Sequence, residues 1–287
     1  MRQTLAFLFL SHLLAGCAGA GGGASTVAPA DSAHLHAVAR EHQGDAPVAS
    51  PATRAAHAEV AAERVTYGTA DARALQGYLA RPVEGDGHSA VIVIHEWWGL
   101  NENMEAMTRR LAAEGYTALA VDLFGGTVAR QPEEARDLVA AVSGDPEAAT
   151  RNLQQAVSYL RGRGAERVGT IGWCFGGGWS LRAALAMPER VDAAVIYYGQ
   201  LVTDTEALRP LQAPVLGLFG AEDRAPAVAQ VREFEAALRS LGKGVSVHVY
   251  EGAGHAFANP SGRNYQPAAA EDAWQRTTEF LARHLSR

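Results

Sequence analysis

The 287-residue sequence has few cysteines, few aromatic residues and little excess charge. Its two cysteines can form neither a disulfide framework nor a cysteine-rich zinc site. A formal net charge of −6 offers no clustered positive charge of the kind that binds nucleic acid. No apolar run reaches the ~20 residues that a membrane-spanning helix needs. With 48% hydrophobic residues, the chain is expected to form a globular enzyme or binding domain.

The first residues have the pattern of an export signal. Arg2 is followed by a short apolar stretch at residues 5–14 and then by small residues, which predicts a signal peptide over residues 1–16 rather than a buried helix. The four residues that end in Cys17 resemble the lipobox of bacterial lipoproteins. The resemblance implies that Cys17 is acylated and anchors the protein to a membrane facing the periplasm, and the following Ala18 implies the outer membrane.

Residues 17–60 are rich in Ala, Gly, Ser and His and show no sustained periodicity, so we expect a lipidated, flexible tether. A short helix is predicted near residues 55–63. We interpret His34, His36 and His42 as solvated tether histidines rather than a metal-binding tract, because no fixed geometry is evident.

From residue 61 to residue 287, predicted strands alternate with predicted helices. The apolar, β-branched run at residues 90–95 is typical of a central strand that is covered on both faces. The alternation predicts one α/β domain with a mostly parallel sheet and helices on both faces. The strands are expected at residues 65–67, 75–80, 90–95, 117–121, 167–171, 191–198, 214–219 and 245–250. The helices are expected at residues 101–114, 132–161 (interrupted near 144–146), 176–186, 227–241 and 268–284.

Between one predicted strand and the next helix, residues 172–176 read Gly-Trp-Cys-Phe-Gly. This is the nucleophile-elbow pattern G-x-S-x-G with sulfur in place of oxygen. Glycines are needed there because a sharp turn brings the backbone close to its neighbours. The pattern favours Cys174 as a nucleophile at a helix N-terminus over the alternative of a buried structural cysteine.

A thiol of ordinary pKa needs a base near neutral pH. His255 follows a predicted strand in a glycine-rich turn, whereas His248 lies within that strand. Asp223 directly follows another strand and is the candidate carboxylate that orients the base, with Glu222 as its rival. The chain order nucleophile, acid, base is that of the α/β-hydrolase arrangement.

The domain resembles the dienelactone hydrolase family, which includes the carboxymethylenebutenolidases. The resemblance covers the whole domain, and the matching segments are residues 91–101 (VIVIHEWWGLN), 122–123, 172–177 (GWCFGG), 197–199, 220–223 (GAED) and 250–257 (YEGAGHAF). It implies an α/β-hydrolase fold that cleaves a small-molecule ester or lactone without a cofactor. It also implies Cys174 as the nucleophile, His255 as the base and Asp223 as its orienting acid.

The loop after residues 90–95 carries a further candidate residue, Glu96. His95-Glu96 does not continue as the zinc motif H-E-x-x-H, because Gly99 stands where the second histidine is required, so no metal is expected. In the α/β-hydrolase arrangement the backbone N–H groups of Trp97 and Phe175 would form the oxyanion hole. The family resemblance further implies that the Glu96 carboxylate holds the thiol in the resting enzyme and helps to remove its proton when substrate binds.

The substrate is less well defined by the sequence. Dienelactone-cleaving members bind the substrate carboxylate with two arginines, and the matching positions here are Pro132 and Asn259. Arg263 is a candidate substitute for one of them, and two further arginines lie near the other position, Arg130 and Arg136. Two alternatives stay open: a lipoprotein of this fold that binds ligand without turnover, and a peptidase-like relative.

Overall fold

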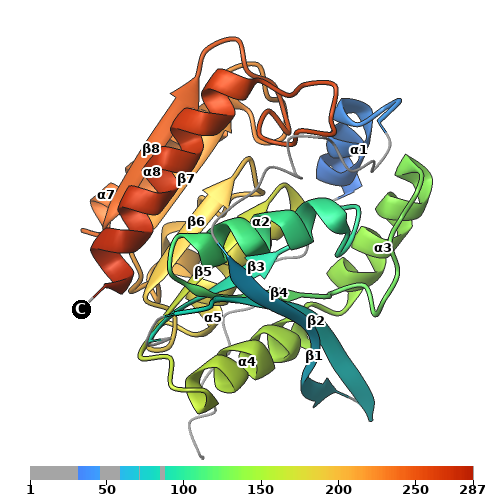
Figure 1. Cartoon of the computed structure of the whole chain (residues 1–287). Coiled ribbons are helices and arrows are strands. Elements are labelled where there is room, and N and C mark those ends of the chain that lie inside the picture. Colours follow the sequence, from blue (N-terminus) through green and yellow to red (C-terminus); the bar gives the residue numbers. More distant parts are fainter. Residues whose placement is uncertain (1–31, 46–58, 71, 85–87, 287) are drawn as a thin grey trace, which may run out of the picture.

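The computed structural model describes residues 32–45, 59–70, 72–84 and 88–286. A single eight-stranded sheet with the strand order β1-β2-β4-β3-β5-β6-β7-β8 forms the centre of this part of the chain (Figure 1). The strands are β1 (Val60–Ala70), β2 (Arg73–Pro82), β3 (Ser89–Ile94), β4 (Thr117–Val121), β5 (Arg167–Trp173), β6 (Ala193–Tyr197), β7 (Val215–Gly220) and β8 (Val245–Tyr250).

The sheet is mostly parallel, as predicted. Strands β3 to β8 pair in parallel, whereas β1 and β2 form an antiparallel hairpin whose second strand runs antiparallel to β4. Because the parallel strands all run the same way, their carboxyl ends meet at one edge, where sites of open α/β sheets form.

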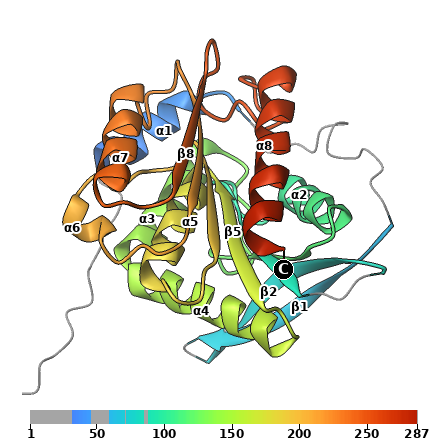
Figure 2. The same ribbon diagram turned by 90° about the vertical axis from the view of Figure 1, so that its left-hand side faces the viewer.

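Helices cover both faces of the sheet. Figure 2 shows α2 and α8 on one side, with α4, α5 and α7 on the other. The alternation of side chains along a strand explains both layers: Val91 and Val93 of β3 belong to one apolar core, and Ile92 and Ile94 belong to the other. The helices are α1 (Ser32–Glu41), α2 (Glu102–Ala113), α3 (Pro132–Gly144), α4 (Pro146–Gly162), α5 (Phe175–Ala186), α6 (Thr205–Leu208), α7 (Val228–Ser240) and α8 (Pro267–Leu285).

Helix ends agree with local signals in the sequence. The side chain of Asn101 accepts a hydrogen bond from the Met104 N–H at the start of α2. Asp145 separates α3 from α4, and its side chain accepts a hydrogen bond from the Ala148 N–H. Pro146 follows at the first position of α4. The predicted interruption near residues 144–146 is therefore confirmed.

The N-terminal region differs from the prediction. Residues 32–41 form helix α1 rather than a flexible tether, and Val38 on this helix is buried in the core with the β3 residues Val91 and Val93. The helix predicted near residues 55–63 is wrong for Val60–Glu63, which begin strand β1. Both segments take their structure from tertiary packing that local composition does not reveal.

The signal peptide predicted at residues 1–16, the Cys17 lipidation site and residues 17–31 and 46–58 of the predicted tether lie outside the described residues. Within the described ranges, no helix combines the length and apolar character needed to cross a bilayer.

The backbone at the start of α5 packs closely against the end of β3. A Cβ atom on Gly176 would lie 2.2 Å from the Ile94 carbonyl oxygen and 2.6 Å from that of His95. We therefore expect Gly176→Ala to lower the free energy of unfolding by about 1–3 kcal/mol through overpacking. Urea unfolding followed by circular dichroism measures this change.

Gly162→Ala is the matched control, because a Cβ there has no heavy atom within 4 Å. Alanine at this helical position should leave stability unchanged or raise it by up to about 1 kcal/mol. Equal stability of the two variants would contradict the packing argument.

Candidate active site

Four of the predicted site residues follow the ends of parallel strands. Glu96 comes after β3, Cys174 directly after β5, Asp223 after β7 and His255 after β8. All four side chains are buried at the carboxyl edge of the sheet. The topology thus brings together residues that are up to 159 positions apart in the chain.

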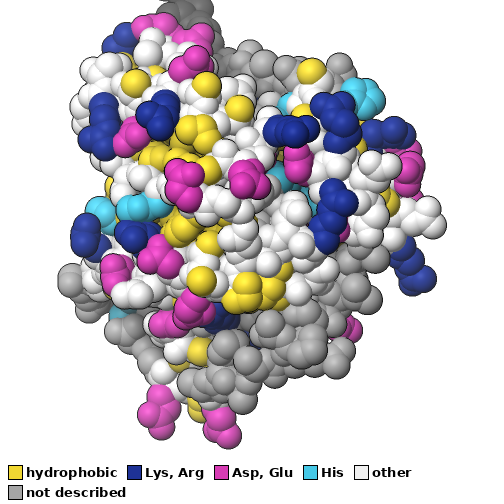
Figure 3. Space-filling model, turned by 90° about the horizontal axis from the view of Figure 1, so that it is seen from above, with side chains coloured by type: hydrophobic (Ala, Val, Ile, Leu, Met, Phe, Trp, Pro, Cys, Tyr) yellow, Lys and Arg dark blue, Asp and Glu magenta, His cyan; other side chains and the backbone are white. Residues whose placement is uncertain are grey.

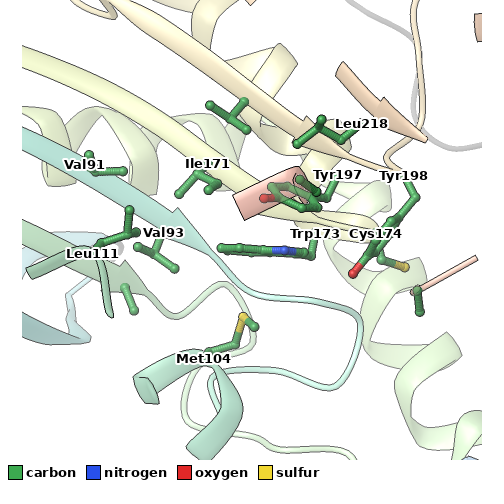
Figure 4. Close-up of a cluster of buried hydrophobic side chains, with 14 of the residues drawn as sticks. Val91, Val93, Met104, Leu111, Ile171, Trp173, Cys174, Tyr197, Tyr198 and Leu218 are labelled. Carbon is green, nitrogen blue, oxygen red and sulfur yellow. The ribbon is translucent and has the colours of Figure 1, made fainter. Parts of the chain in front are cut away.

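Cys174 lies in a strained turn. Its φ of +53° is in the left-handed region, which is uncommon for a residue other than glycine. The turn is tight: a Cβ on Gly172 would lie 2.0 Å from the carbonyl oxygen of Gly176. The Cys174 carbonyl accepts hydrogen bonds from the N–H groups of Gly177 and Gly178, so the turn leads directly into α5. Figure 4 shows Cys174 beside Tyr198, at the end of a buried apolar cluster.

His255 is oriented by Asp223. The His255 Nδ1 atom lies 2.9 Å from Asp223 Oδ2, and the other carboxylate oxygen accepts a hydrogen bond from the Ala225 N–H at 2.7 Å. The rival Glu222 is exposed, and His248 instead lies 3.1 Å from Ser246 Oγ within β8. The structure therefore pairs His255 with Asp223, as the sequence predicts.

The charges around Cys174 favour its thiolate. Burial raises the pKa of the Cys174 thiol, but His255 and a second imidazole, that of His42, outweigh this effect and bring the pKa to about 6. Burial lowers the pKa of His255, whereas the Asp223 carboxylate and Cys174 raise it well above its ordinary value. An imidazolium–thiolate pair is the arrangement that such shifts favour.

Glu96 is held by Asn259. The Asn259 side-chain amide donates to Glu96 Oε2 at 2.7 Å, while no described residue donates a hydrogen bond to the buried Oε1 atom. Burial, followed by the proximity of Cys174, raises the pKa of Glu96 to about 7. Asn259, recognised in the sequence as a departure from a substrate-binding arginine, is thus the partner of Glu96.

His95 has a structural role. Its Nδ1 atom lies 2.6 Å from the Glu96 carbonyl oxygen, and its Nε2 atom accepts a hydrogen bond from the Leu123 N–H at 3.1 Å. Since both ring nitrogens bond to backbone atoms, His95 holds the loop after β3 in place and has no nitrogen left for a metal.

His42 is the principal site residue that the sequence analysis missed. The solvated tether histidine that we expected is buried at the carboxyl end of α1, with its Nε2 atom 4.0 Å from Cys174 Sγ. Its Nδ1 atom lies 3.0 Å from Asp45 Oδ2, and its ring stacks on Trp97 with centroids 4.5 Å apart. The spacing of Leu35, Val38 and His42 is helical and was the available signal.

One group of metal-ligand side chains in the described ranges is compact. Donor atoms of His42, Cys174 and His255 all lie within 4.8 Å of one another. These three residues could hold a metal ion by distance, but the same arrangement also suits a thiolate between two imidazoles. His34 and His36 do not join this group.

A pocket opens beside Cys174, where the empty space, together with the open solvent at the mouth, amounts to about 570 Å³. Trp97, Phe175 and Trp179 form apolar walls, as do Leu35 and Val38 of α1. Two cationic side chains also line it, Arg136 and Arg182.

Other arginines lie outside this pocket. Arg263 contacts the Glu41 carbonyl oxygen and the Asp45 carboxylate, and it does not line the pocket. Figure 3 shows basic side chains on both sides of this end of the molecule, including the side where α1 and α3 lie.

Comparisons with known proteins agree with this architecture. The model of the dienelactone hydrolase family matches residues 75–285. A "Putative carboxymethylenebutenolidase" of Saccharolobus solfataricus is 31% identical, covering 77% of this chain and 98% of the relative. A protein of the same name from Methylorubrum extorquens is 34% identical over 73% of this chain and 77% of its own.

A solved structure has the same fold. The crystal structure of a "Putative Dienelactone Hydrolase" from Klebsiella pneumoniae is 28% identical, has a TM-score of 0.70 and covers 78% of this chain and 99% of its own. The nucleophile turn, the His–Asp pair and strands β3 to β8 all lie inside the segment that the family model matches. The chain belongs to the dienelactone hydrolase family.

Proposed function

We propose that this ester and lactone hydrolase works through Cys174 as the nucleophile, His255 as the base and Asp223 as the carboxylate that orients the base. Family membership supports the hydrolase class. One observation carries the assignment of residues. The buried Cys174 sulfur and a ring nitrogen of His255 lie within 4.8 Å of each other, and Asp223 binds the His255 Nδ1 atom.

In the proposed reaction, the Cys174 thiolate attacks the ester carbonyl and forms the S–C bond of a tetrahedral intermediate. The intermediate collapses with cleavage of the C–O bond, and His255 gives its Nε2 proton to the leaving oxygen. His255 then removes a proton from water, which attacks the thioester and releases the acid and the thiolate. Asp223 keeps the Nδ1 proton in place, so that Nε2 faces the sulfur.

Backbone N–H groups would stabilise the oxyanion. Phe175 is the first residue of α5, so its N–H has no acceptor within the helix. Trp97 follows Glu96 and lines the same pocket as Cys174 and Phe175. We assign the oxyanion hole to the N–H groups of Trp97 and Phe175, where the helix dipole adds to the stabilisation.

Glu96 is proposed to act with the thiol. Because its pKa is raised to about 7 and its Oε1 atom is buried without a partner among the described residues, the carboxyl group can exchange a proton near neutral pH. The Asn259 amide that contacts Glu96 is uncharged, so it does not fix the carboxyl group in its ionised form. These properties fit a residue that can accept the thiol proton and so take part in activating Cys174.

The pocket supports an ester or lactone with an apolar or aromatic acyl part. Its walls carry indole and phenyl rings, and Arg136 and Arg182 place positive charge at its lining. Neither matching position for the two carboxylate-binding arginines carries a cation, since these positions are Pro132 and Asn259. We therefore propose that the substrate is an ester or lactone other than dienelactone itself.

Cys174→Ala tests the nucleophile. We expect kcat/KM for p-nitrophenyl acetate to fall at least about 1000-fold, because the acyl-enzyme can no longer form. Circular dichroism should show an unchanged fold, since alanine fits the space of the sulfur. Hydrolysis of p-nitrophenyl acetate at the wild-type rate would contradict the assignment. The matching p-nitroanilide, cleaved by a peptidase-like enzyme, should not turn over.

The pH profile provides a second test. Since the pKa of Cys174 is about 6, kcat/KM should rise with pH through about 6 as thiol becomes thiolate. It should fall again only at alkaline pH, where His255, whose pKa is raised, loses the proton that the leaving group needs. A rising limb near the ordinary thiol pKa of about 8.5 would contradict the proposed environment of the sulfur.

We propose that the exported protein is anchored at the outer membrane by acylation of Cys17, on the basis of the lipobox-like pattern in residues 14–17. Cys17→Ala should move the protein from the membrane fraction to the soluble periplasmic fraction and abolish its labelling with radioactive palmitate. Because Cys17 lies outside the catalytic domain, esterase activity should remain. Labelling that persists in the variant would contradict the anchor.

A further inference from the structure

Cys174 is approached by two histidine–carboxylate pairs. One is His255 with Asp223, which the proposed function already uses. The other is His42 with Asp45, at the end of α1 and in the turn that follows it. The two imidazole rings lie nearly perpendicular, with centroids 5.3 Å apart, and the His42 Nε2 atom lies 4.0 Å from the sulfur.

The two pairs have the same hydrogen-bond arrangement. In each, the carboxylate accepts from Nδ1–H, so a neutral ring presents the lone pair of Nε2 towards Cys174. A thiol has one proton and can donate it to only one of two acceptors. If both rings carry a proton on Nε2, both donate to a thiolate, and each imidazolium is balanced by its own aspartate.

On this basis, and resting on the proposed function, we propose that His42 is a catalytic residue. Held by Asp45, it donates its Nε2–H to the Cys174 sulfur and stabilises the thiolate before attack and after its release from the acyl-enzyme. During acylation the S–C bond forms, the C–O bond breaks and His255 supplies the proton to the leaving oxygen. His42 keeps its own proton throughout.

The charged groups around His42 agree with this role. Asp45 binds its Nδ1 atom, and Cys174 and His255 face its Nε2 side. Glu96 is a further acid whose charge acts on the ring. Arg263 lies on the far side of Asp45, with Nε 4.0 Å from Oδ1, and helps to hold the carboxylate.

The segment that carries His42 is built into the site. Val38 is part of the core, Leu35 lines the catalytic pocket and the His42 ring stacks on Trp97. Residues 32–45 lie outside the part of the chain that the family model matches, so this second pair is an addition to the matched domain.

The test compares His42→Ala and Asp45→Asn with the control His36→Ala, which alters an exposed residue of the same helix. The readouts on the full chain are the rate of Cys174 alkylation by iodoacetamide as a function of pH and kcat/KM for p-nitrophenyl acetate. His42→Ala should slow alkylation at pH 6 about fivefold by raising the thiol pKa by about one unit from about 6. The difference should vanish well above pH 9, where the thiol is ionised in every variant.

The ester readout should follow alkylation, with a fall in kcat/KM at pH 6 that lessens as the pH rises. Asp45→Asn should shift both profiles in the same direction by a smaller amount, and His36→Ala should match the wild type. Circular dichroism of each variant reports on the fold, and Asp45→Asn keeps the imidazole in case His42→Ala loosens α1.

Three outcomes overturn the proposal. If His42→Ala left the pH profile of alkylation unchanged and raised only KM, His42 would contribute to substrate binding and not to the thiolate. Faster turnover in His42→Ala would make the segment an obstruction. Activity that is lost with a chelator and restored by Zn²⁺ would make the cluster a metal centre. If Cys174→Ala kept its esterase activity, the proposed function would fail, while the alkylation of wild-type Cys174 would still report on His42.

Discussion

The strained turn at Cys174 is the constraint on which the rest of the site depends. Cys174 has a left-handed φ and is the single residue between the end of β5 and the start of α5. This turn places the sulfur at the carboxyl edge of the sheet. The turn exists only because Gly172 and Gly176 allow backbone atoms to approach where a Cβ would clash. The parallel strands then deliver Glu96, Asp223 and His255 to the same edge, because each of these residues follows the end of its own strand.

Burial and charge act against each other around this sulfur. A fully buried thiol alone would keep its proton, since desolvation raises its pKa. Two imidazoles reverse that effect, and each imidazole is in turn held by an aspartate. Glu96 completes the cluster. Its hydrogen-bond partner is the neutral amide of Asn259 rather than a cation, and its pKa is raised to about 7. The result is a reactive sulfur within a compact, largely buried network.

Much of this arrangement is readable in the sequence, for definite physical reasons. The run at residues 90–95 and the Gly-x-Cys-x-Gly turn are local signals, and strand ends in a parallel sheet predict which residues meet. Asp223 and His255 were found in this way and do form a pair. The partner of Glu96 was not predicted, because Asn259 was compared only with an arginine that binds substrate.

His42 was missed for a different reason. Its segment is short and rich in Ala and His, so its helical spacing is weak, and its burial arises from contacts with Trp97 and Cys174 far along the chain. The same limit explains the helix wrongly expected over Val60–Glu63, where pairing with β2 overrides local composition.

The most direct measurement for the central claim is the site of acylation. The protein is mixed with a slowly hydrolysed p-nitrophenyl ester, quenched in acid and digested, and the peptides are mapped by mass spectrometry. The account predicts one acyl group per chain, on the peptide that contains Cys174 and removable by neutral hydroxylamine as a thioester. An acyl group on another residue, or turnover that never yields a covalent intermediate under these conditions, would contradict it.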